Sequence, residues 1–416
     1  MVSLPTLPAS GSTSWYPHYS ALDAAVRALP EATAAQRTPV YADALGIEGD
    51  GTTQVGVKIQ TALDNLAPGQ MLHLAPGKVY NHTDSRLIVR RDNTGVDGNG
   101  ATLLSNDYTR GGLRVDGEYS GWCKTGGVVR RLRHVIKGAT VRTALNKDEG
   151  PMTGWRTSNM LVEDVQTEGS SCAGMFFARV TGLVNVNPVV YSSKADGVHH
   201  TDGTKQALVI RPIVVKGGDD GVAVVSYIVD AGGICEDITV LDPRVQKTYG
   251  GRGLTVVGGR RVRYYGGDVS ETFAAGVLVG VESSYNSHSV EDVKVLGTVL
   301  SDINMLWPGE RTDIPDHGSV ITQSSVTGRF VKDVDIKVKI RSTNPAKAIM
   351  GDRVGRADAS SAYGTFENVK VEATVEGLYN PNATASAPQL NSQTANLGLS
   401  PRPVYDLRFG GRYLAA

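Results

Sequence analysis

Short turns centred on glycine, each followed by an apolar strand, recur along the middle of the chain at a nearly fixed step. The glycine of each Gly-apolar pair marks the repeat: Gly174, Gly197, Gly221, Gly253 and Gly276. These positions are 23, 24, 32 and 23 residues apart, so one step is longer by the length of a loop. A recurring step of this size predicts a solenoid with coils of roughly 22 to 24 residues.

A second series, of polar residues, interleaves with the glycines. Asp or Asn precedes an alternating apolar run in LVEDVQT (161–167), ICEDITV (234–240), SVEDVKV (289–295), FVKDVDI (330–336) and FENVKVE (366–372). Asp and Asn side chains bond to nearby backbone amides in turns, and alternate residues of a strand face one side. The series therefore predicts structural turns before inward-facing Val and Ile residues, at Asp164, Asp237, Asp292, Asp333 and Asn368.

A single coil cannot bury an apolar face, whereas stacked strands about 4.8 Å apart create one continuous core. We therefore predict an all-β fold, a right-handed parallel β-helix. The open end of such a stack exposes unpaired strand edges and needs a cap. The segment VGVKIQTALDNLAPGQ predicts an N-terminal capping helix that stops before Pro68-Gly69, with an apolar stripe at Val57, Ile59, Ala62, Leu63 and Leu66.

The two ends of the chain differ from the repeats. Residues 1–45 are rich in Ala, Pro, Ser and Thr and are interpreted as an arm or attachment segment. Residues 46–380 form the predicted parallel β-helix. Residues 381–416 lose the repeat and predict a loop or tail, within which DLRFGGRYL could return as a strand.

Composition narrows the choice of partners. With 49 glycines, 6% aromatic and 20% charged residues, the chain suits many short strands. Lys plus Arg and Asp plus Glu balance at 42 each, which argues against nucleic acid and anionic membranes and is compatible with a neutral partner such as a glycan. We expect no membrane insertion, and no signal peptide is seen in the sequence.

Three cysteines are present, and none has a CxxC spacing. An odd number cannot pair completely, so neither a disulfide scaffold nor a zinc site is indicated. We interpret them as buried thiols: Cys123, Cys172 and Cys235.

The passage from residue 46 to 80 resembles the opening of the pectate-lyase-like β-helix superfamily, as used by bacteriophage tail-spike proteins. The resemblance rests on its GDG turn, the following helical segment, Pro76-Gly77 and Tyr80, and GVDGNGATL at 95–103 looks like a first core coil. It implies a virion tail protein, tail spike or minor tail protein, whose N-terminal arm contacts other tail proteins. Relatives of this sort are usually homotrimers.

Residues 192–259 resemble the catalytic stretch of polygalacturonases, the inverting pectin hydrolases, with their pattern NTDG, GDD and GHG. The corresponding sequence segments here are KADG (194–197), GDDG (218–221) and GRG (251–253). The family's three acidic positions carry over to Asp196, Asp219 and Asp220. Its His position carries Arg252, and no R-x-K follows.

If Gly197 and Gly221 share a turn position in successive coils, Asp196 stacks on Asp220 and Asp219 lies beside them. Carboxylates held this close raise the pKa of at least one, as a general acid requires. The resemblance implies that Asp220 protonates the leaving oxygen while the other two activate a water. Two alternatives stay open: ordinary turns, in which Asp caps amides and Gly takes positive φ, and a Ca²⁺ site.

Four further residues are candidate substrate-binding groups. His199, His200 and Asp202 follow Asp196 closely, and strand alternation sends one His inward and the other outward. Arg252 could clamp an anionic sugar, or it could pair with the Asp row. We expect no cofactor and no resident metal.

The leading hypothesis is a phage tail protein that recognises host cell-surface polysaccharide, with cleavage by the carboxylates left open. A free polygalacturonase-type glycoside hydrolase is the first alternative, and a purely structural tail component is the second. The sequence does not identify the polysaccharide.

Overall fold

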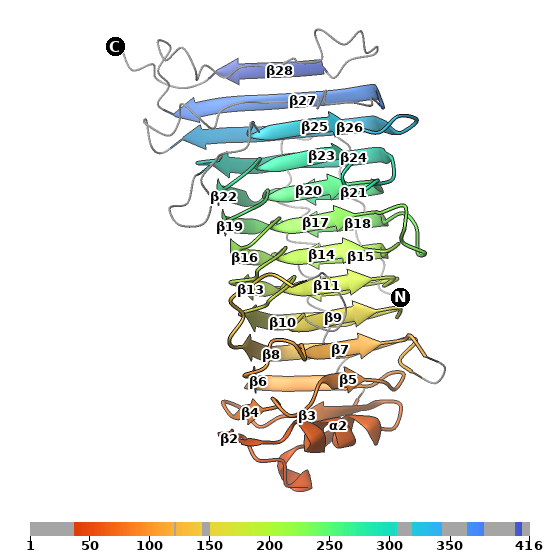
Figure 1. The fold of residues 1–416 in the computed structure, drawn as a ribbon, viewed down its shortest axis with the longest axis vertical. Coiled ribbons are helices and arrows are strands. Elements are labelled where there is room, and N and C mark those ends of the chain that lie inside the picture. The colour runs from red at the N-terminus through yellow and green to blue at the C-terminus, as the bar shows by residue number, and fades with distance from the viewer. Residues whose placement is uncertain are drawn as a thin grey trace.

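The computed structural model describes residues 37–119, 122–143, 150–303, 305, 318–342, 364–377 and 404–409. Over this part of the chain the secondary structure is almost entirely strand, with one α-helix, α2 (Gly56–Asp64), and one short 3-10 helix, η1 (Asp43–Leu45). The strands stack one above another along a single long axis (Figure 1). The prediction of an all-β fold is confirmed.

Two sheets run the length of the stack, and every pairing between their strands is parallel. One has nine strands, one in each of nine successive coils: β5 (Leu87–Val89), β7 (Leu113–Asp116), β9 (Met152–Trp155), β11 (Met175–Ala178), β14 (Val198–Thr201), β17 (Val222–Val225), β20 (Leu254–Val257), β23 (Val277–Val281) and β25 (Val320–Ser324). Parallel strands joined coil by coil in this way define a parallel β-helix.

The second sheet has nineteen strands and wraps the remaining sides of each coil. Its strands are β1 (Thr38–Tyr41), β2 (Asp50–Gln54), β3 (Gln70–His73), β4 (Val79–Asn81), β6 (Gly95–Ser105), β8 (Val128–Ile136), β10 (Leu161–Glu168), β12 (Val184–Val186), β13 (Val189–Tyr191), β15 (Lys205–Ile210), β16 (Ile213–Gly217), β18 (Glu236–Leu241), β19 (Arg244–Thr248), β21 (Gly259–Tyr265), β22 (Asp268–Thr272), β24 (Val290–Ser301), β26 (Phe330–Ser342), β27 (Thr365–Gly377) and β28 (Val404–Phe409).

The glycine repeat gives the register of the nine-stranded sheet. Each repeat glycine immediately precedes one of β11, β14, β17, β20 and β23, and the first residues of these strands pair in sequence order. The register predicted from the sequence is therefore confirmed. The long step of 32 residues arises from a loop at 226–235, between β17 and β18.

Glycine is needed at these positions for packing and not for positive φ, which corrects the sequence-based interpretation. A Cβ atom on Gly197 would lie 2.4 Å from Val214 Cγ1 and 2.5 Å from the Gly221 carbonyl oxygen. On Gly221 it would lie 2.5 Å from Val245 Cγ1 and 2.6 Å from the Gly253 oxygen. Neither glycine has a positive φ. The corner is closed too tightly against the opposite sheet to admit a side chain.

The polar series has the structural role predicted, but inside strands. All five residues have φ between 51° and 57° and lie within β10, β18, β24, β26 and β27, where this left-handed conformation bends the strand. Among residues other than glycine, Asp and Asn tolerate this conformation best. The prediction that these residues precede the strands was therefore wrong.

Asp164 belongs to a different corner from the other four. The rest lie in one row, which also contains Arg261. Asp164 accepts a hydrogen bond of 2.7 Å from Asn187 Nδ2 in the next coil. Following the strand register through the later coils, the position stacked in line with Asp164 is Asp242, which lies five residues after Asp237. Similar local sequence therefore occurs at two separate bends of the coil.

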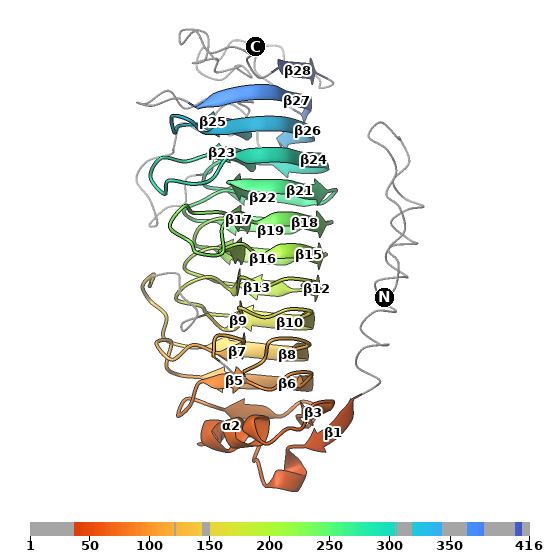
Figure 2. The same ribbon diagram turned by 90° about the vertical axis from the view of Figure 1, so that its right-hand side faces the viewer.

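The core is one continuous cluster of buried apolar side chains from Ala42 to Ala373, dominated by Val, Ile and Leu. Helix α2 lies at the N-terminal end of the stack (Figure 2), and four of the five residues of its predicted stripe are buried in this core. The fifth, Val57, is 58% exposed, which corrects the predicted stripe.

The sheet also extends into the terminal segments. Strand β1 falls inside the predicted arm of residues 1–45 and pairs with β3, so the sheet begins before the predicted boundary. Strand β28 pairs with β27 and contains the start of DLRFGGRYL, the segment expected to return as a strand. Residues 1–36, 378–403 and 410–416 lie outside the described residues, so the arm and the tail stay predictions.

The three cysteines are free and buried, as predicted. Burial raises the pKa of the Cys123 thiol to about 11 and that of Cys235 to about 12. Both thiols therefore stay protonated at neutral pH. Among the described residues, the only α-helix is too short to cross a membrane.

The glycine corner gives a stability prediction. Gly221→Ala should lower the free energy of unfolding by about 1–3 kcal/mol, because the added Cβ forces the corner away from Val245 and the next coil. The matched control is Gly217→Ala in strand β16, where a Cβ would meet ordinary contacts of 3.5 Å or more. This variant should stay within about 1 kcal/mol of the wild type. Denaturant unfolding measures both, and equal losses would contradict the packing explanation.

Candidate active site

Three carboxylates meet at one edge of the nine-stranded sheet, where two successive coils enter it. Asp196 comes two residues before β14, and Asp219 and Asp220 come directly before the glycine that precedes β17. Because β14 and β17 pair with Val198 opposite Val222, Asp196 stacks on Asp220. One oxygen atom from each of the three carboxylates lies within 4.8 Å of the others. The structure brings together the three residues proposed as catalytic.

Backbone hydrogen bonds fix this ladder of carboxylates. The Asp220 amide donates to Asp196 Oδ1 at 3.0 Å, and the Arg252 amide donates to Asp220 Oδ1 at 2.8 Å. Asp196 and Asp220 therefore each cap an amide of the next coil. The turn-forming role weighed from the sequence is present, and it holds the acidic groups in the stacked position that chemistry would require.

Burial changes the protonation of the cluster. Asp196 and Asp220 are each 5% exposed, and the Asp219 side chain is 21% exposed. Burial raises the pKa of Asp220 to about 8; the nearby Asp219 and Asp196 carboxylates add to the increase, and Arg252 opposes it. Burial and the charge of Asp196 also raise the pKa of Asp219. At neutral pH Asp220 therefore holds a proton.

Arg252 is held between two carboxylates. Its Nη1 lies 3.4 Å from Asp220 Oδ1, and its Nη2 binds Glu282 Oε1. Although burial acts in the opposite direction, these two carboxylates raise the pKa of Arg252. The structure thus shows the salt bridge to the Asp row that was one of the two sequence alternatives for this residue.

Two members of the cluster were missed by sequence reasoning. Glu282 directly follows β23, at the opposite end of that strand from the glycine edge, so the repeat gave no reason to group it with Arg252. Arg142 lies 77 residues from Asp219 in sequence, yet its Nη1 lies 2.6 Å from Asp219 Oδ2. It follows strand β8 in a segment outside the repeat pattern.

His199 and His200 point to opposite sides of β14, as alternation predicted. His199 Nδ1 lies 2.5 Å from Asp196 Oδ2, and its ring stacks on Phe176 with centroids 5.3 Å apart. Its Nε2 is buried and has no hydrogen-bond partner among the described residues. His199 thus adjoins the carboxylates, with one nitrogen held by Asp196.

His200 lies in the core. It is fully buried, stacks on Phe177 with centroids 5.5 Å apart, and has Nδ1 3.2 Å from the Ala223 carbonyl oxygen. Burial lowers its pKa to about 4, so the ring is neutral at pH 7. From this position it packs the coil and does not reach a ligand on the outer face.

Asp202 lies beyond the other end of β14, away from the cluster. Its Oδ2 is 2.9 Å from Arg179 Nε, and its Oδ1 accepts a 2.7 Å hydrogen bond from the Gly232 amide. Its φ of 48° is that of a bend. These contacts hold Asp202 at a structural bend, and its role in substrate binding stays a prediction.

The carboxylates could in principle hold a Ca²⁺ ion, since hard cations prefer oxygen clusters. In this structure, however, they already face cations of the protein itself: Arg142 at Asp219 and Arg252 at Asp220. An added divalent cation would be repelled by both guanidinium groups. The donor set therefore fits proton transfer better than metal binding.

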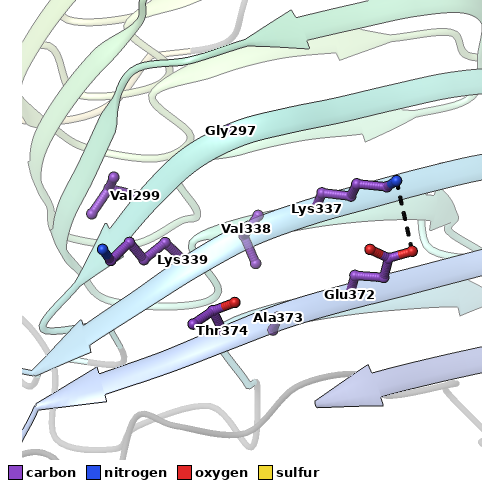
Figure 3. Close-up of a pocket in the computed structure, with 8 residues that line it drawn as sticks. All are labelled: Gly297, Val299, Lys337, Val338, Lys339, Glu372, Ala373 and Thr374. Atoms are coloured by element: carbon purple, nitrogen blue, oxygen red, sulfur yellow. Dashed lines mark ion pairs between the residues drawn. The ribbon is translucent and has the colours of Figure 1, made fainter. Parts of the chain in front are cut away.

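A pocket of about 340 Å³ lies elsewhere, over β24, β26 and β27 (Figure 3). Its lining includes Lys337 and Glu372, whose charged atoms are 3.7 Å apart, and it contains none of the clustered carboxylates. The paired charges leave no group suited to chemistry there, so the carboxylate cluster remains the candidate active site.

Comparisons with known proteins identify the fold. No family model and no curated protein matches the sequence. Among solved structures, the catalytic domain of a GH87 α-1,3-glucanase in complex with tetrasaccharides has a TM-score of 0.55 at 13% sequence identity, covering 91% of this chain and 68% of that chain. The A-module of the Azotobacter vinelandii mannuronan C-5 epimerase AlgE6 has a TM-score of 0.54 at 15% identity, covering 90% and 99%.

A hyperthermoactive exopolygalacturonase from Thermotoga maritima has a TM-score of 0.52 at 15% identity, covering 85% of this chain and 91% of that chain. At such identities the likeness shows a shared fold. The chain is therefore a parallel β-helix protein, of the same architecture as these three.

The raised pKa of Asp220 predicts a pH-dependent effect on stability. Between its ordinary value of 3.8 and about 8, the folded carboxyl keeps a proton that the unfolded chain releases, so stability falls as pH rises through this window. Asp220→Asn removes the titration. The stability of this variant relative to the wild type should increase by at least about 1 kcal/mol from pH 4 to pH 8. Denaturant unfolding at several pH values measures it, and a constant difference would contradict the assignment.

A second prediction concerns Glu282. Glu282→Gln should lower the pKa of Asp220, because Arg252 then no longer shares its charge with a second carboxylate. Carboxyl ¹³C NMR titration measures the pKa, with the resonance assigned by its loss in Asp220→Asn. Glu236→Gln, which removes a carboxylate from a separate cluster with Arg260, is the control and should leave the Asp220 titration unchanged. An unchanged titration in Glu282→Gln would contradict the proposed charge sharing.

Proposed function

We propose that this protein binds polysaccharide along its β-helix and hydrolyses a glycosidic bond at Asp196, Asp219 and Asp220. The observation that carries the proposal is the stacked carboxylate cluster, in which one member is protonated at neutral pH and its neighbours are positioned to act as bases. Carboxyl groups with environments that push their pKa values apart are suited to acid and base roles in one reaction.

In the proposed reaction the Asp220 carboxyl gives its proton to the glycosidic oxygen as the bond to the anomeric carbon breaks. A water attacks that carbon and loses a proton to the carboxylate of Asp196 or Asp219, so one sugar end gains OH and the other H. His199, hydrogen-bonded to Asp196, orients that carboxylate. The carboxylates are closer together than the roughly 6.5–9.5 Å usual for inverting enzymes, so inversion rests on the polygalacturonase resemblance and not on this spacing.

The comparisons support the substrate class. Three parallel β-helix proteins of similar architecture are named as an α-1,3-glucanase, a mannuronan epimerase and an exopolygalacturonase, all of which act on polysaccharides. Fold similarity alone does not fix function, so the argument depends on the carboxylate cluster.

We further propose that the protein is a phage tail-spike or minor tail protein that recognises host cell-surface polysaccharide. The GDG turn, the helical segment and the Pro76-Gly77 and Tyr80 positions support this assignment through the resemblance described above. In this proposal the β-helix is right-handed, α2 caps its N-terminal end, three copies form a homotrimer, and the N-terminal arm joins other tail proteins.

Hydrolysis is tested by incubating the protein with surface polysaccharide from candidate host bacteria and measuring new reducing ends. Asp220→Asn should lower the rate by about 10²–10⁴-fold, because the general acid is lost. Asp333→Asn is the matched control: it makes the same change at a strand bend where Asn368 already adopts the same conformation, and it should keep wild-type activity. Equal activity in Asp220→Asn and the wild type, or activity in neither, would remove the hydrolase proposal.

A further inference from the structure

Two loops beside the carboxylate cluster are joined to each other. One is the long insertion at 226–235 after β17, and the other spans 282–289 after β23. The Ile228 amide donates to the Asn286 backbone carbonyl oxygen at 3.1 Å, and the His288 amide donates to the Ser226 backbone carbonyl oxygen at 2.8 Å. Figure 1 shows both loops projecting from the same side of the stack. We refer to this joined pair of loops as the ledge.

The ledge presents two tyrosines. The rings of Tyr227 and Tyr285 lie with centroids 5.5 Å apart at 44°. Tyr285 is 54% exposed, whereas Tyr227 is half-buried behind it. A tyrosine offers a binding partner an apolar ring face and a polar hydroxyl, and these loops are fixed by backbone hydrogen bonds.

The ledge borders the carboxylates. Glu282, the first residue of the 282–289 loop, binds Arg252, whose Nη1 lies 3.4 Å from Asp220 Oδ1. Burial and the charge of Asp219 raise the pKa of Tyr285, and burial and the charge of Asp196 raise the pKa of Tyr227. Arg142, whose side chain is 43% exposed, is bound to Asp219 at 2.6 Å. An apolar ring face, a guanidinium donor and a carboxylate acceptor therefore lie together, which is the set of groups that a sugar ring with hydroxyl substituents can use.

The charges at this edge favour a neutral sugar. Both guanidinium groups are already paired with carboxylates. The other groups at this edge are the carboxyl groups of Asp196, Asp219 and Glu282. A uronic acid would add a carboxylate beside them and would meet no unpaired guanidinium group among these residues.

We infer that Tyr285, supported by Tyr227 and flanked by Arg142, forms a subsite that binds a ring of a neutral polysaccharide beside Asp219. This inference rests on the proposed function and specifies its substrate class. The polysaccharide chain then crosses from the carboxylates onto the ledge, which explains why a coil with an inserted loop lies at this point of the stack.

The test uses the full-length protein on an array of neutral and uronate-containing bacterial oligosaccharides, followed by calorimetric titration of the best-bound neutral oligosaccharide. Tyr285→Ala should weaken binding at least about tenfold through loss of ring contact, and Tyr285→Phe should keep binding within about threefold. Tyr119→Ala is the matched control, since Tyr119 is 55% exposed and also contacts another aromatic ring, that of Trp122. It should bind as the wild type does.

The outcomes separate the two proposals. If the wild type binds glycans and Tyr285→Ala binds them equally well, the subsite is overturned while the proposed function stands. If the wild type binds only uronate-containing glycans, the neutral substrate class is overturned. If the wild type binds no glycan on the array, the proposed function fails together with the subsite.

Discussion

The structure depends on the in-register parallel pairing of each strand with the strand one coil away. Because this pairing repeats, residues separated by one coil length stack directly, whatever lies between them in sequence. The stacking of Asp196 on Asp220 is a direct consequence of the pairing of β14 with β17. It also brings the carboxylates of Asp196 and Asp220 each to an amide of the next coil, so these hydrogen bonds hold both the site and the fold.

What the sequence could predict follows from the same constraint. The glycines before β11, β14, β17 and β20 recur because the corner there excludes a Cβ, so their spacing predicted the register, the position of the inserted loop and the grouping of the three aspartates. The physical reason assigned to them, positive φ, was wrong, because a glycine that avoids a clash and one that adopts a left-handed turn look the same in sequence. Asp164 was grouped with the other four polar residues for a similar reason: two bends of the coil favour the same residue types.

The remaining members of the site could not be predicted because they do not repeat. Arg142 and Tyr285 come from segments between strands. Glu282 follows the end of β23, whereas Arg252 precedes the start of β20, although their side chains form an ion pair. No period connects them to the aspartates. Their contribution is also collective: burial raises the pKa of Asp220, while Arg252 limits the increase and is itself held by Glu282. The pKa of Asp220 thus depends on how far the group is removed from water, and the order of residues in the sequence does not give this.

The ledge has a consequence for how proteins of this architecture can change. The strands of each coil pair only with those of the coils next to it, so a loop of different length or composition can replace 226–235, or the part of 282–289 that follows Glu282, without altering the strands beneath. The carboxylates are fixed by the coils, and the surface beside them is fixed by the loops. Selection can therefore act on ligand preference and on bond-breaking chemistry separately, and one acidic ladder can serve many different glycans.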